Sequence, residues 1–447
     1  MNSASANAAP TKVRFIVLAG LCVAAALSYI ARNAIAVAES TVRADLGLTK
    51  GQSGWLMSAF FFSYALCQIP GAQFGKATGP RRALPLFAAV WSVATAVTAF
   101  AGGLVSFVAA RIVQGVAQAG LFPICTVTVA KWFPKTGRAF ATGALGSFMS
   151  VGGALCAWLT GVLLEVLQPH VGPGWNWRLT FLLYGVPGLL WAVWFWRWFR
   201  DEPREHPSLN AVELGLIEPE AAANSQRADS QTSAPTPWRQ LFSSPALWWI
   251  CGQQVCRAAG YMFFTSWFAT YLQETRGVSI ATSGFLNMLP LLAVVLGGFA
   301  GGALSDWLLR RTGSRTVARK HMGAACLFVC ALFTFGSMFI ADALLAVLVI
   351  SGGSFFAALA GPCSYTITID MGGPHVAAVN ATMNMLGNFG AWAFPIAVPW
   401  LLTRFGSWDA VLVVFGACYL AGAAFWLLLK PDGDIVEQSL ARNLASA

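Results

Sequence analysis

The chain has 447 residues, of which 57% are hydrophobic and 10% are charged, and its formal net charge is +10. Soluble proteins carry about 25% charged residues, so this composition excludes an ordinary soluble protein and indicates one that crosses a bilayer many times. A nucleic-acid partner is also excluded, because the positive residues are distributed by loop, as described below.

The apolar segments are long enough to cross a membrane, since a helix needs about 20 mostly apolar residues to span roughly 30 Å of hydrocarbon. Twelve segments meet this length: 15–38, 55–74, 83–101, 104–130, 139–164, 179–199, 246–272, 283–309, 322–341, 343–369, 376–402 and 410–429. The sequence therefore predicts an all-α membrane protein with twelve transmembrane helices.

A long polar segment divides these helices into two groups of six. It contains five prolines and many Ser, Ala, Asn, Gln and Glu residues, which is typical of a partly disordered linker. The expected parts are a cytoplasmic tail at 1–14, an N-terminal bundle at 15–199, a cytoplasmic linker at 200–244 with a short surface helix near 209–220, a C-terminal bundle at 245–430 and a cytoplasmic tail at 431–447.

The distribution of Lys and Arg predicts the topology. With both termini on one side, 20 of the 28 basic residues lie on that side and 5 lie on the other. Because basic loops stay in the cytoplasm, we expect cytoplasmic termini in a cell inner membrane. The remaining three, Arg32, Arg111 and Arg257, lie inside predicted spans. The ten cysteines fall in apolar segments without metal-ligand spacing, so no disulfide, metal or cofactor is expected.

Arg32 lies near the end of the first apolar segment, in Tyr-Ile-Ala-Arg-Asn at positions 29–33. A charge that faces lipid costs several kcal/mol on the order of the insertion scales, so an intramembrane arginine normally faces protein or a water-filled cavity. Arg32 is therefore a candidate for binding an anion. The alternative is that it snorkels to the interface or pairs with a structural acid.

The two halves show weak internal similarity. A glycine followed by a tight basic turn ends the second segment at residues 71–82 and recurs after the eighth at residues 302–311. Repeated six-helix halves are typical of transporters that hold their substrate between the halves and alternate access to it.

Short motifs along nearly the whole chain carry a family resemblance. They are Ser58-Ala59-Phe60 through Tyr64, Gln68 to Gly71, Arg111 to Gly115 through Phe122-Pro123, Lys131 to Pro134 with Arg138, Trp177-Arg178 through Phe181 and Gly185, Asp201-Glu202-Pro203 with His206-Pro207 and Glu213, and Trp267 with Tyr271-Leu272. Together they resemble the major facilitator superfamily and, within it, the anion:cation symporters. That group includes galactonate, glucarate and hexuronate transporters and is similar to vesicular glutamate and sialic acid carriers.

The resemblance implies that Arg32 holds a substrate carboxylate and that Tyr64 joins the same site. A planar guanidinium binds a carboxylate through paired hydrogen bonds, which agrees with that role. Tyr29 lies almost one turn before Arg32 and can present its hydroxyl there. Both tyrosines have the alternative of being packing or interface rings. If Arg257 also lines the cavity, two positive charges favour an anion; otherwise Arg257 snorkels to the headgroups.

Neutral donors and acceptors lie in the tenth and eleventh segments, at Ser364, Tyr365, Asn384 and Asn388. The resemblance implies that Asn384 contacts a sugar acid. Such polar residues can equally bond neighbouring helices. Trp267 is a candidate wall of the cavity.

Two departures from the resembled group concern coupling. Its proton-coupled members carry an acid just before the first-span arginine and another in the fourth span, where this chain has Ala31 and Gln118. A carboxylate beside an arginine can link protonation to binding, but alanine and glutamine cannot titrate. We keep Gln118 as a binding candidate and expect uniport, anion exchange or coupling through another group in place of standard proton symport.

The remaining candidates are structural or gating residues. Arg111 begins an Arg-x-x-Gln-Gly pattern in the fourth span and is expected to have a structural or gating role. The basic turns supply Arg81, Arg82, Asp306 and Arg310. Lys76 stands where the resembled family usually has Asp, so the gate on that side is expected to be looser.

The sequence thus predicts a monomeric carrier of a small organic anion, such as a hexonate, a hexuronate or a related carboxylate, that works by alternating access. A coupling proton or a counter-anion is left open. The alternative is a non-transporting receptor that senses an organic anion on the same fold, since sensing needs no coupling acid. An enzyme is not expected, because the spans contain no catalytic constellation or phosphate-binding loop.

Overall fold

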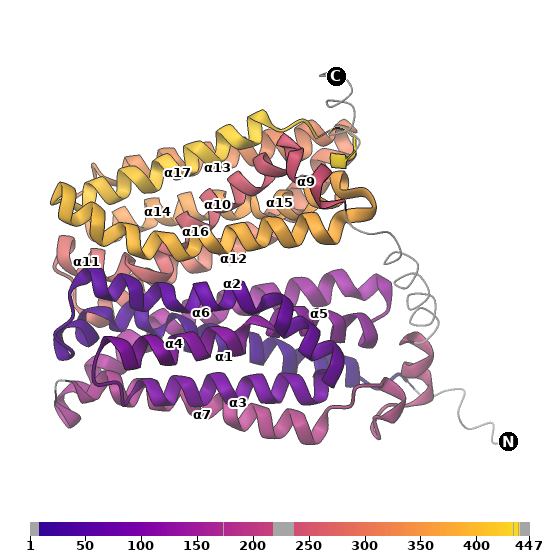
Figure 1. Cartoon of the computed structure of the whole chain (residues 1–447), viewed down its shortest axis with the longest axis horizontal. Coiled ribbons are helices and arrows are strands. Elements are labelled where there is room, and N and C mark those ends of the chain that lie inside the picture. Colours follow the sequence, from indigo (N-terminus) through magenta and orange to yellow (C-terminus); the bar gives the residue numbers. More distant parts are fainter. Residues whose placement is uncertain (1–8, 173, 218–236, 432, 437, 439–447) are drawn as a thin grey trace.

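The computed structural model describes residues 9–172, 174–217, 237–431, 433–436 and 438, and its regular structure in these parts is helical. The long helices lie side by side in two stacked groups (Figure 1). We call the first group the N-terminal bundle. It consists of α1 (Val13–Asp45), α2 (Lys50–Thr78), α3 (Pro80–Thr98), α4 (Leu104–Ala119), α5 (Leu121–Trp132), α6 (Lys135–Val171) and α7 (Trp175–Trp198).

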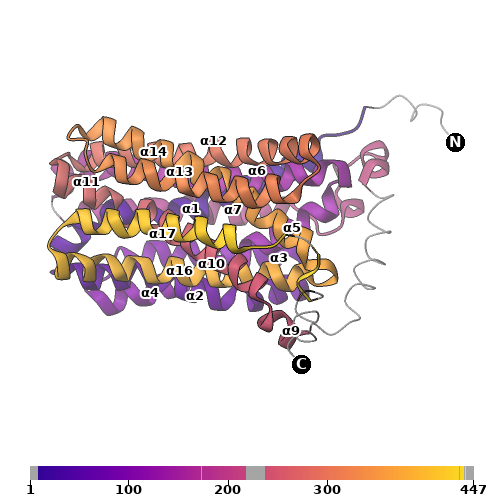
Figure 2. The ribbon, with the colours of Figure 1, turned by 90° about the horizontal axis from the view of Figure 1, so that it is seen from above.

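The second group, the C-terminal bundle, follows a linker that contains the short helices η2 (Pro203–Glu205) and α9 (Trp238–Ser243). It consists of α10 (Pro245–Ser266), α11 (Phe268–Arg276), α12 (Ile280–Thr312), the π-helix η3 (Thr316–His321), α13 (Met322–Ser337), α14 (Ala343–Leu359), α15 (Gly361–Gly372), the 3-10 turn η4 (Gly373–His375), α16 (Val376–Phe405) and α17 (Trp408–Leu428). In the turned view the helices of both bundles still run along one axis (Figure 2).

Nine helical segments in the described parts of the chain are long and apolar enough to cross a membrane. The other three predicted spans are occupied by α2, α3 and α10, which pack in the same bundles. Polar residues lower the mean hydropathy of two of them, since α3 carries Arg81 and Arg82 in its first turn and α10 carries two glutamines and Arg257. The predicted all-helical membrane fold is confirmed, and each predicted span is mostly helical, although the seventh is interrupted at Trp267 and the helix of the ninth ends at Ser337.

Two predicted spans are broken at matching places in the two halves. The fourth span bends at Gly120 between α4 and α5, and the tenth bends at Ala360 between α14 and α15. Gly120 allows α2 to approach closely, since a Cβ there would lie 3.0 Å from the carbonyl carbon of Gly71. The repeated break agrees with the predicted relation between the halves.

The two ends of the bundles are named separately here because different contacts occur at each. We call the end where α1 begins and α17 ends the linker end, and the end with the α1–α2 turn the far end (Figure 1). At the far end Thr49 and Gln52 form a capping box on α2, and the side chain of Asp342 accepts from the backbone NH of Leu345 at the start of α14.

At the linker end the first part of the linker packs on the N-terminal bundle. Residues 211–217 are helical, which agrees with the start of the predicted surface helix; residues 218–220 lie outside the described residues. Glu213 is buried, and its Oε2 accepts from Thr11 Oγ1 at 2.6 Å and from the NH of Val13 at 3.1 Å. The carboxylate thereby accepts hydrogen bonds from the first NH groups of α1, where the helix dipole favours negative charge.

Candidate functional site

Arg32 lies between helices and away from the lipid-facing surface. Its side chain is only 8% exposed, and its Nε donates to Oε1 of Gln118 on α4 at 3.3 Å. Among the described residues no carboxylate lies within 4 Å of it, and beside the bond to Gln118 its guanidinium also interacts with the side chain of Tyr29. The predicted alternative of a structural acid partner is therefore not realised in the described part of the chain.

Three aromatic rings surround this guanidinium. The Cζ of Arg32 lies 4.4 Å from the ring centroid of Tyr29, 4.6 Å from that of Phe60 and 4.7 Å from that of Tyr64. Cation–π contacts of this kind stabilise a desolvated cation by about 2 kcal/mol and leave its planar N–H edge to other partners. The rings therefore hold the charge without neutralising it.

Arg111 braces the backbone of α1 beside the site. Its Nη1 donates to the carbonyl of Arg32 at 3.0 Å and to Oε1 of Gln114 at 2.7 Å, and Nε2 of Gln114 donates to the carbonyl of Ala31 at 2.9 Å. The Cζ of Arg111 lies 5.0 Å from the Phe60 ring, so Phe60 contacts both guanidiniums. This geometry suits the structural role predicted for Arg111.

Gln118 occupies the place where the resembled transporters have an acid. It is buried; its Oε1 accepts from Arg32 and its Nε2 donates to the carbonyl of Ser28 at 3.0 Å. A neutral amide thus orients Arg32 and leaves its charge uncompensated. Because Ala31 is also neutral, no carboxylate pairs with Arg32 among the described residues.

The C-terminal bundle contributes a second cation and an exposed ring. Arg257 on α10 is half-buried and donates from Nη2 and Nε to Oε1 of Gln254, at 3.0 Å and 3.2 Å. Tyr261, one turn further along, interacts electrostatically with Tyr29, Arg32 and Arg257. Tyr261 is therefore near enough to both cations to interact with each of them.

Tyr365 on α15 is 42% exposed although Tyr29, which interacts with it electrostatically, is half-buried between the bundles. Tyr365 is therefore close enough to Tyr29 to interact with it from the other bundle. This arrangement joins candidate residues from both halves of the chain.

Asn384 links the halves directly. Its Nδ2 donates to Oε1 of Gln68 on α2 at 3.2 Å, and the Nδ2 of Asn388 donates to the carbonyl of Asn384 at 2.9 Å. Gln68 belongs to a motif of the family resemblance but was not among the predicted site residues. In this conformation Asn384 bonds a neighbouring helix, which is the alternative that the sequence left open, whereas Asn388 bonds within its own helix.

Two predicted site residues, Ser364 and Trp267, bond elsewhere and not to the residues around Arg32 and Arg257. Ser364 is buried and donates to Oε1 of Gln253 at 2.9 Å, which joins α15 to α10. Trp267 is fully buried, and its Nε1 donates to the carbonyl of Pro395 on α16 at 3.0 Å. Both bonds lie within the C-terminal bundle.

Four of the predicted gating residues, Asp306, Arg310, Arg81 and Arg82, lie at the linker end. Asp306 contacts its own bundle, and Arg81 contacts its own bundle and Asp201 of the linker. Arg319 of η3 pairs with Asp306 at 3.6 Å and with Asp370 at 3.4 Å, and it also bonds Ser305. The backbone NH of Arg81 donates to Asp201 at 2.8 Å, and Arg81 Nε donates to the carbonyl of Trp196 at 3.3 Å. Arg82 and Arg310 are exposed.

At the far end, by contrast, the side chains bond across the two bundles. Glu274 of α11 lies 3.4 Å from Arg43 and 2.6 Å from Lys50, and Ser40 donates to Gln273 at 2.7 Å. Glu39 is buried; it pairs with Arg43 at 2.7 Å and accepts from Thr270 at 2.9 Å. The structure is therefore closed at the far end.

Glu39 was missed because the predicted span ended at residue 38, which placed the acid in a loop. The available signal was the Glu-to-Arg spacing of four residues, which continues a helix face.

Comparisons with known proteins agree with this architecture. The model of a family described as Major Facilitator Superfamily matches residues 21–358. A probable sulfoacetate transporter of Cupriavidus necator, SauU, is 32% identical over 94% of this chain and 94% of its own length. A D-galactonate transporter of Escherichia coli is 28% identical over 95% of this chain and 98% of its own length.

A solved structure shares the fold. It is the crystal structure of a bacterial homologue of the human lysosomal transporter Spinster in an inward-facing, unoccupied conformation; its TM-score is 0.71 at 20% identity, and the match covers 94% of this chain and 95% of that chain. With a family model matched over most of its length and a 32% identical relative aligned end to end, the chain belongs to the major facilitator superfamily of membrane transporters.

Proposed function

We propose that this protein is a secondary transporter of a small organic anion and that it works by alternating access. The observation that carries the proposal is the buried guanidinium of Arg32, which has aromatic rings on its faces, an amide on its Nε and no acid within 4 Å among the described residues. A bound carboxylate or sulfonate would supply the missing negative charge by pairing with the N–H groups of the guanidinium.

The proposed site uses residues of both bundles. Arg32, Tyr29, Tyr64 and Gln118 come from the N-terminal bundle, while Arg257, Tyr365, Asn384 and Asn388 come from the C-terminal bundle. The bond between Asn384 and Gln68 would open when the bundles separate, which supports a substrate held between them. Ser364 and Trp267 retain a proposed role only in another conformation of the carrier.

The chemical class of the substrate is supported by the relatives. Sulfoacetate and D-galactonate, named for two of them, are both small carboxylates; sulfoacetate carries a second anionic group, a sulfonate, and D-galactonate carries hydroxyls. We propose a sugar acid, such as a hexonate or a hexuronate, or a related small acid. The protein would work as a monomer in the cell inner membrane with both termini in the cytoplasm.

For coupling we propose uniport or anion exchange, because Ala31 and Gln118 replace the acids of the resembled symporters. Neither residue can release a proton when substrate binds to Arg32. A group elsewhere in the chain would have to supply any proton coupling.

The test is uptake of labelled hexonates, hexuronates and sulfoacetate by proteoliposomes that contain the purified protein. Arg32→Ala should abolish uptake, whereas Arg404→Ala, at an exposed position beside Phe405, should leave it unchanged. Full uptake by Arg32→Ala would refute the proposal. Binding without any flux would favour the receptor alternative, and uptake driven by an imposed pH gradient with acidification of the lumen would refute the coupling scheme.

A further inference from the structure

A carboxylate is held between two cations at the far end of the bundles. Oε1 of Glu274 lies 3.4 Å from Nη2 of Arg43, and its Oε2 lies 2.6 Å from Nζ of Lys50. The same Oε2 accepts a hydrogen bond from Nε1 of Trp408 at 3.0 Å. Each carboxylate oxygen thus faces a cation of its own. We call Arg43 and Lys50 the outer cation pair.

The outer cation pair and the carboxylate that it holds belong to different bundles. Arg43 lies on α1 and Lys50 begins α2, whereas Glu274 lies on α11 and Trp408 begins α17. Alternating access separates the bundles at this end, so Glu274 and Trp408 move away together while both cations remain in the N-terminal bundle. Opening of the far end therefore vacates a site that binds a carboxylate in the closed state.

Glu39 fixes the orientation of Arg43 within this pair. Its buried carboxylate accepts from Nε of Arg43 at 2.7 Å, which leaves Nη2 to face the C-terminal bundle. Asp45, the other acid of α1 in this region, pairs with Arg178 of α7 at 3.0 Å. Because Glu39 offsets the charge of Arg43, Lys50 keeps one uncompensated positive charge once the opposite bundle has moved away. The vacated pair therefore attracts an anion.

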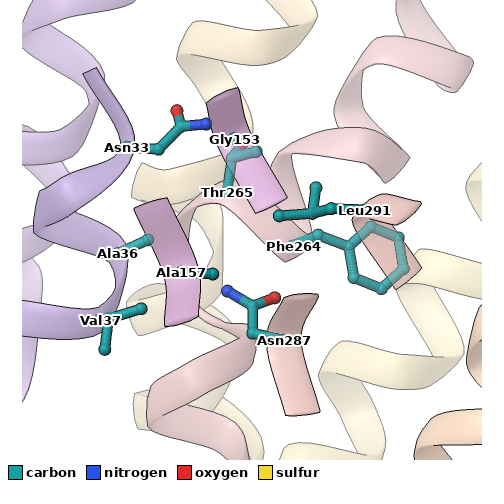
Figure 3. A pocket seen from close by; sticks show the side chains of 9 residues that line it. All are labelled: Asn33, Ala36, Val37, Gly153, Ala157, Phe264, Thr265, Asn287 and Leu291. Atoms are coloured by element: carbon teal, nitrogen blue, oxygen red, sulfur yellow. The ribbon is translucent and has the colours of Figure 1, made fainter. Parts of the chain in front are cut away.

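The outer cation pair is separate from the Arg32 site but lies on the same side of α1. Arg32 and Arg43 are eleven residues apart, which is about three turns and about 16 Å along the helix. Figure 3 shows the intervening turns of α1 packed against α6 and the C-terminal bundle, where Asn33 faces toward Asn287. None of the residues that line this space is charged. An anion that binds at the outer pair is therefore not bound by Arg32 at the same time.

We propose that the outer cation pair is a second carboxylate-binding site, at which an organic anion arriving at the far end replaces the carboxylate of Glu274. The inference rests on the proposed function, because it gives that carrier a first contact with its substrate. Substrate and Glu274 compete for the same two cations, so binding at the pair favours the conformation that is open at the far end. The side chains of Arg43 and Lys50 are 25% and 33% exposed, so this binding is weak and decreases with salt.

The first experiment measures opening of the far end by alkylation of a cysteine introduced by Gln273→Cys, since Gln273 bonds Ser40 across the two bundles. A membrane-impermeant maleimide outside the proteoliposomes reaches only molecules whose far end faces outward. Arg32→Ala is included, so that any effect of the anion arises away from the proposed central site. D-galactonate or sulfoacetate should accelerate alkylation about two- to fivefold, the range expected for exposed ion pairs. Neutral D-galactose, and sodium chloride at the same ionic strength, should not.

Two variants with Arg32 intact distinguish a binding site from a simple gate, because both weaken the contact between the bundles. Lys50→Gln removes a cation from the pair and should raise the half-saturating concentration for uptake from the far end about two- to fivefold. Glu274→Gln removes the competing carboxylate and should lower that concentration. A gate without a binding site predicts shifts in the same direction. Arg404→Gln is the matched control, since it removes an exposed cation at the same end that lies over the Phe405 ring, and it should leave half-saturation unchanged.

The outcomes separate the outer site from the proposed function. Alkylation that neither acid accelerates, or that galactose or chloride accelerates equally, overturns the outer site. Shifts of half-saturation in the same direction in Lys50→Gln and Glu274→Gln also overturn it. The carrier role stands in each of these cases if Arg32→Ala abolishes uptake. Uptake that survives Arg32→Ala overturns the proposed function, whereas acceleration by the acids in that background still supports a carboxylate site at the outer pair.

Discussion

The hydroxyl of Thr270 donates a hydrogen bond of 2.9 Å to the carboxylate of Glu39, and this bond joins α11 of one bundle to α1 of the other. The second carboxylate oxygen of Glu39 accepts from Arg43, which also reaches Glu274 across the same junction. The contact therefore combines a buried acid, its own cation and the opposite bundle. It lies at the far end, about two turns of α1 beyond Arg32.

Glu39→Gln is predicted to shift the carrier toward conformations open at the far end. The amide keeps the shape but removes the charge, and hydrogen bonds to a charged group contribute about 1.5–3 kcal/mol. A single reactive cysteine introduced by Gln273→Cys should then be alkylated about tenfold faster. Asp342→Asn, which affects only the start of α14 at the same end, is the control and should not change the rate; an unchanged rate in Glu39→Gln would contradict the gating role.

Gln118→Glu is predicted to make substrate uptake depend on pH. A carboxylate at this position would pair with Arg32 at neutral pH and compete with the anionic substrate, whereas its protonated form would behave like the native amide. Uptake at pH 7.5 should fall by about tenfold, and the loss should diminish at pH 5.5. Gln118→Leu should lower uptake equally at both values, so equal losses in the glutamate and leucine variants would argue against this account.

Gly120→Ala is predicted to destabilise the protein. Its Cβ would lie 2.4 Å from the Phe87 ring and 3.0 Å from the backbone of Gly71, and backbone atoms cannot move aside cheaply. Overpacking of this kind costs about 1–3 kcal/mol. The detergent-solubilised variant should unfold at a lower temperature than the wild type. The control is Gly143→Ala, since a Cβ at Gly143 would meet nothing within 4 Å; a Tm loss as large in this variant would rule out the packing explanation.

The sequence predicted the features that depend on chemical composition. Helix number, the division into halves and the position of Arg32 away from lipid follow from the cost of exposing polar groups to hydrocarbon. The hydrogen-bond partners of individual side chains could not be predicted from the sequence, because they depend on how the helices rotate and pack. Trp267 illustrates this limit, since its indole bonds Pro395 inside one bundle although its sequence context was that of a cavity wall.

Other contacts escaped prediction for the same reason, because they form only when the helices pack together. Asn33 directly follows Arg32 in the sequence, yet it points at α6 and α12 because neighbouring residues on a helix face different directions. Its relation to Asn287 exists only once the two bundles are packed together. The hydrogen bond between Thr11 and Glu213 likewise joins residues that are 202 positions apart in the sequence.

His206 in the linker lies outside the spans and is held in an apolar contact. It is buried, and its ring lies edge-on to Trp198 at 4.6 Å and to Trp132 at 5.7 Å between centroids. Its Nδ1 accepts from the NH of Ser208 at 3.3 Å. Burial in this apolar contact, followed by the positive charge of Arg200, lowers the pKa of His206 below its ordinary value of 6.5.

The lowered pKa predicts a loss of stability in acid. Below about pH 6.5 the unfolded chain takes up a proton at His206 that the folded protein does not, so this contribution is complete above that pH and falls as the pH approaches the folded pKa. His206→Phe keeps a ring between the tryptophans and removes the titration, so its Tm should fall less than that of the wild type between pH 7.5 and 5.5. Asn210→Ala, which weakens the bonds to Thr11 nearby, should lower the Tm at both values and keep the wild-type pH dependence. If His206→Phe has the same pH dependence as the wild type, another group controls the acid sensitivity.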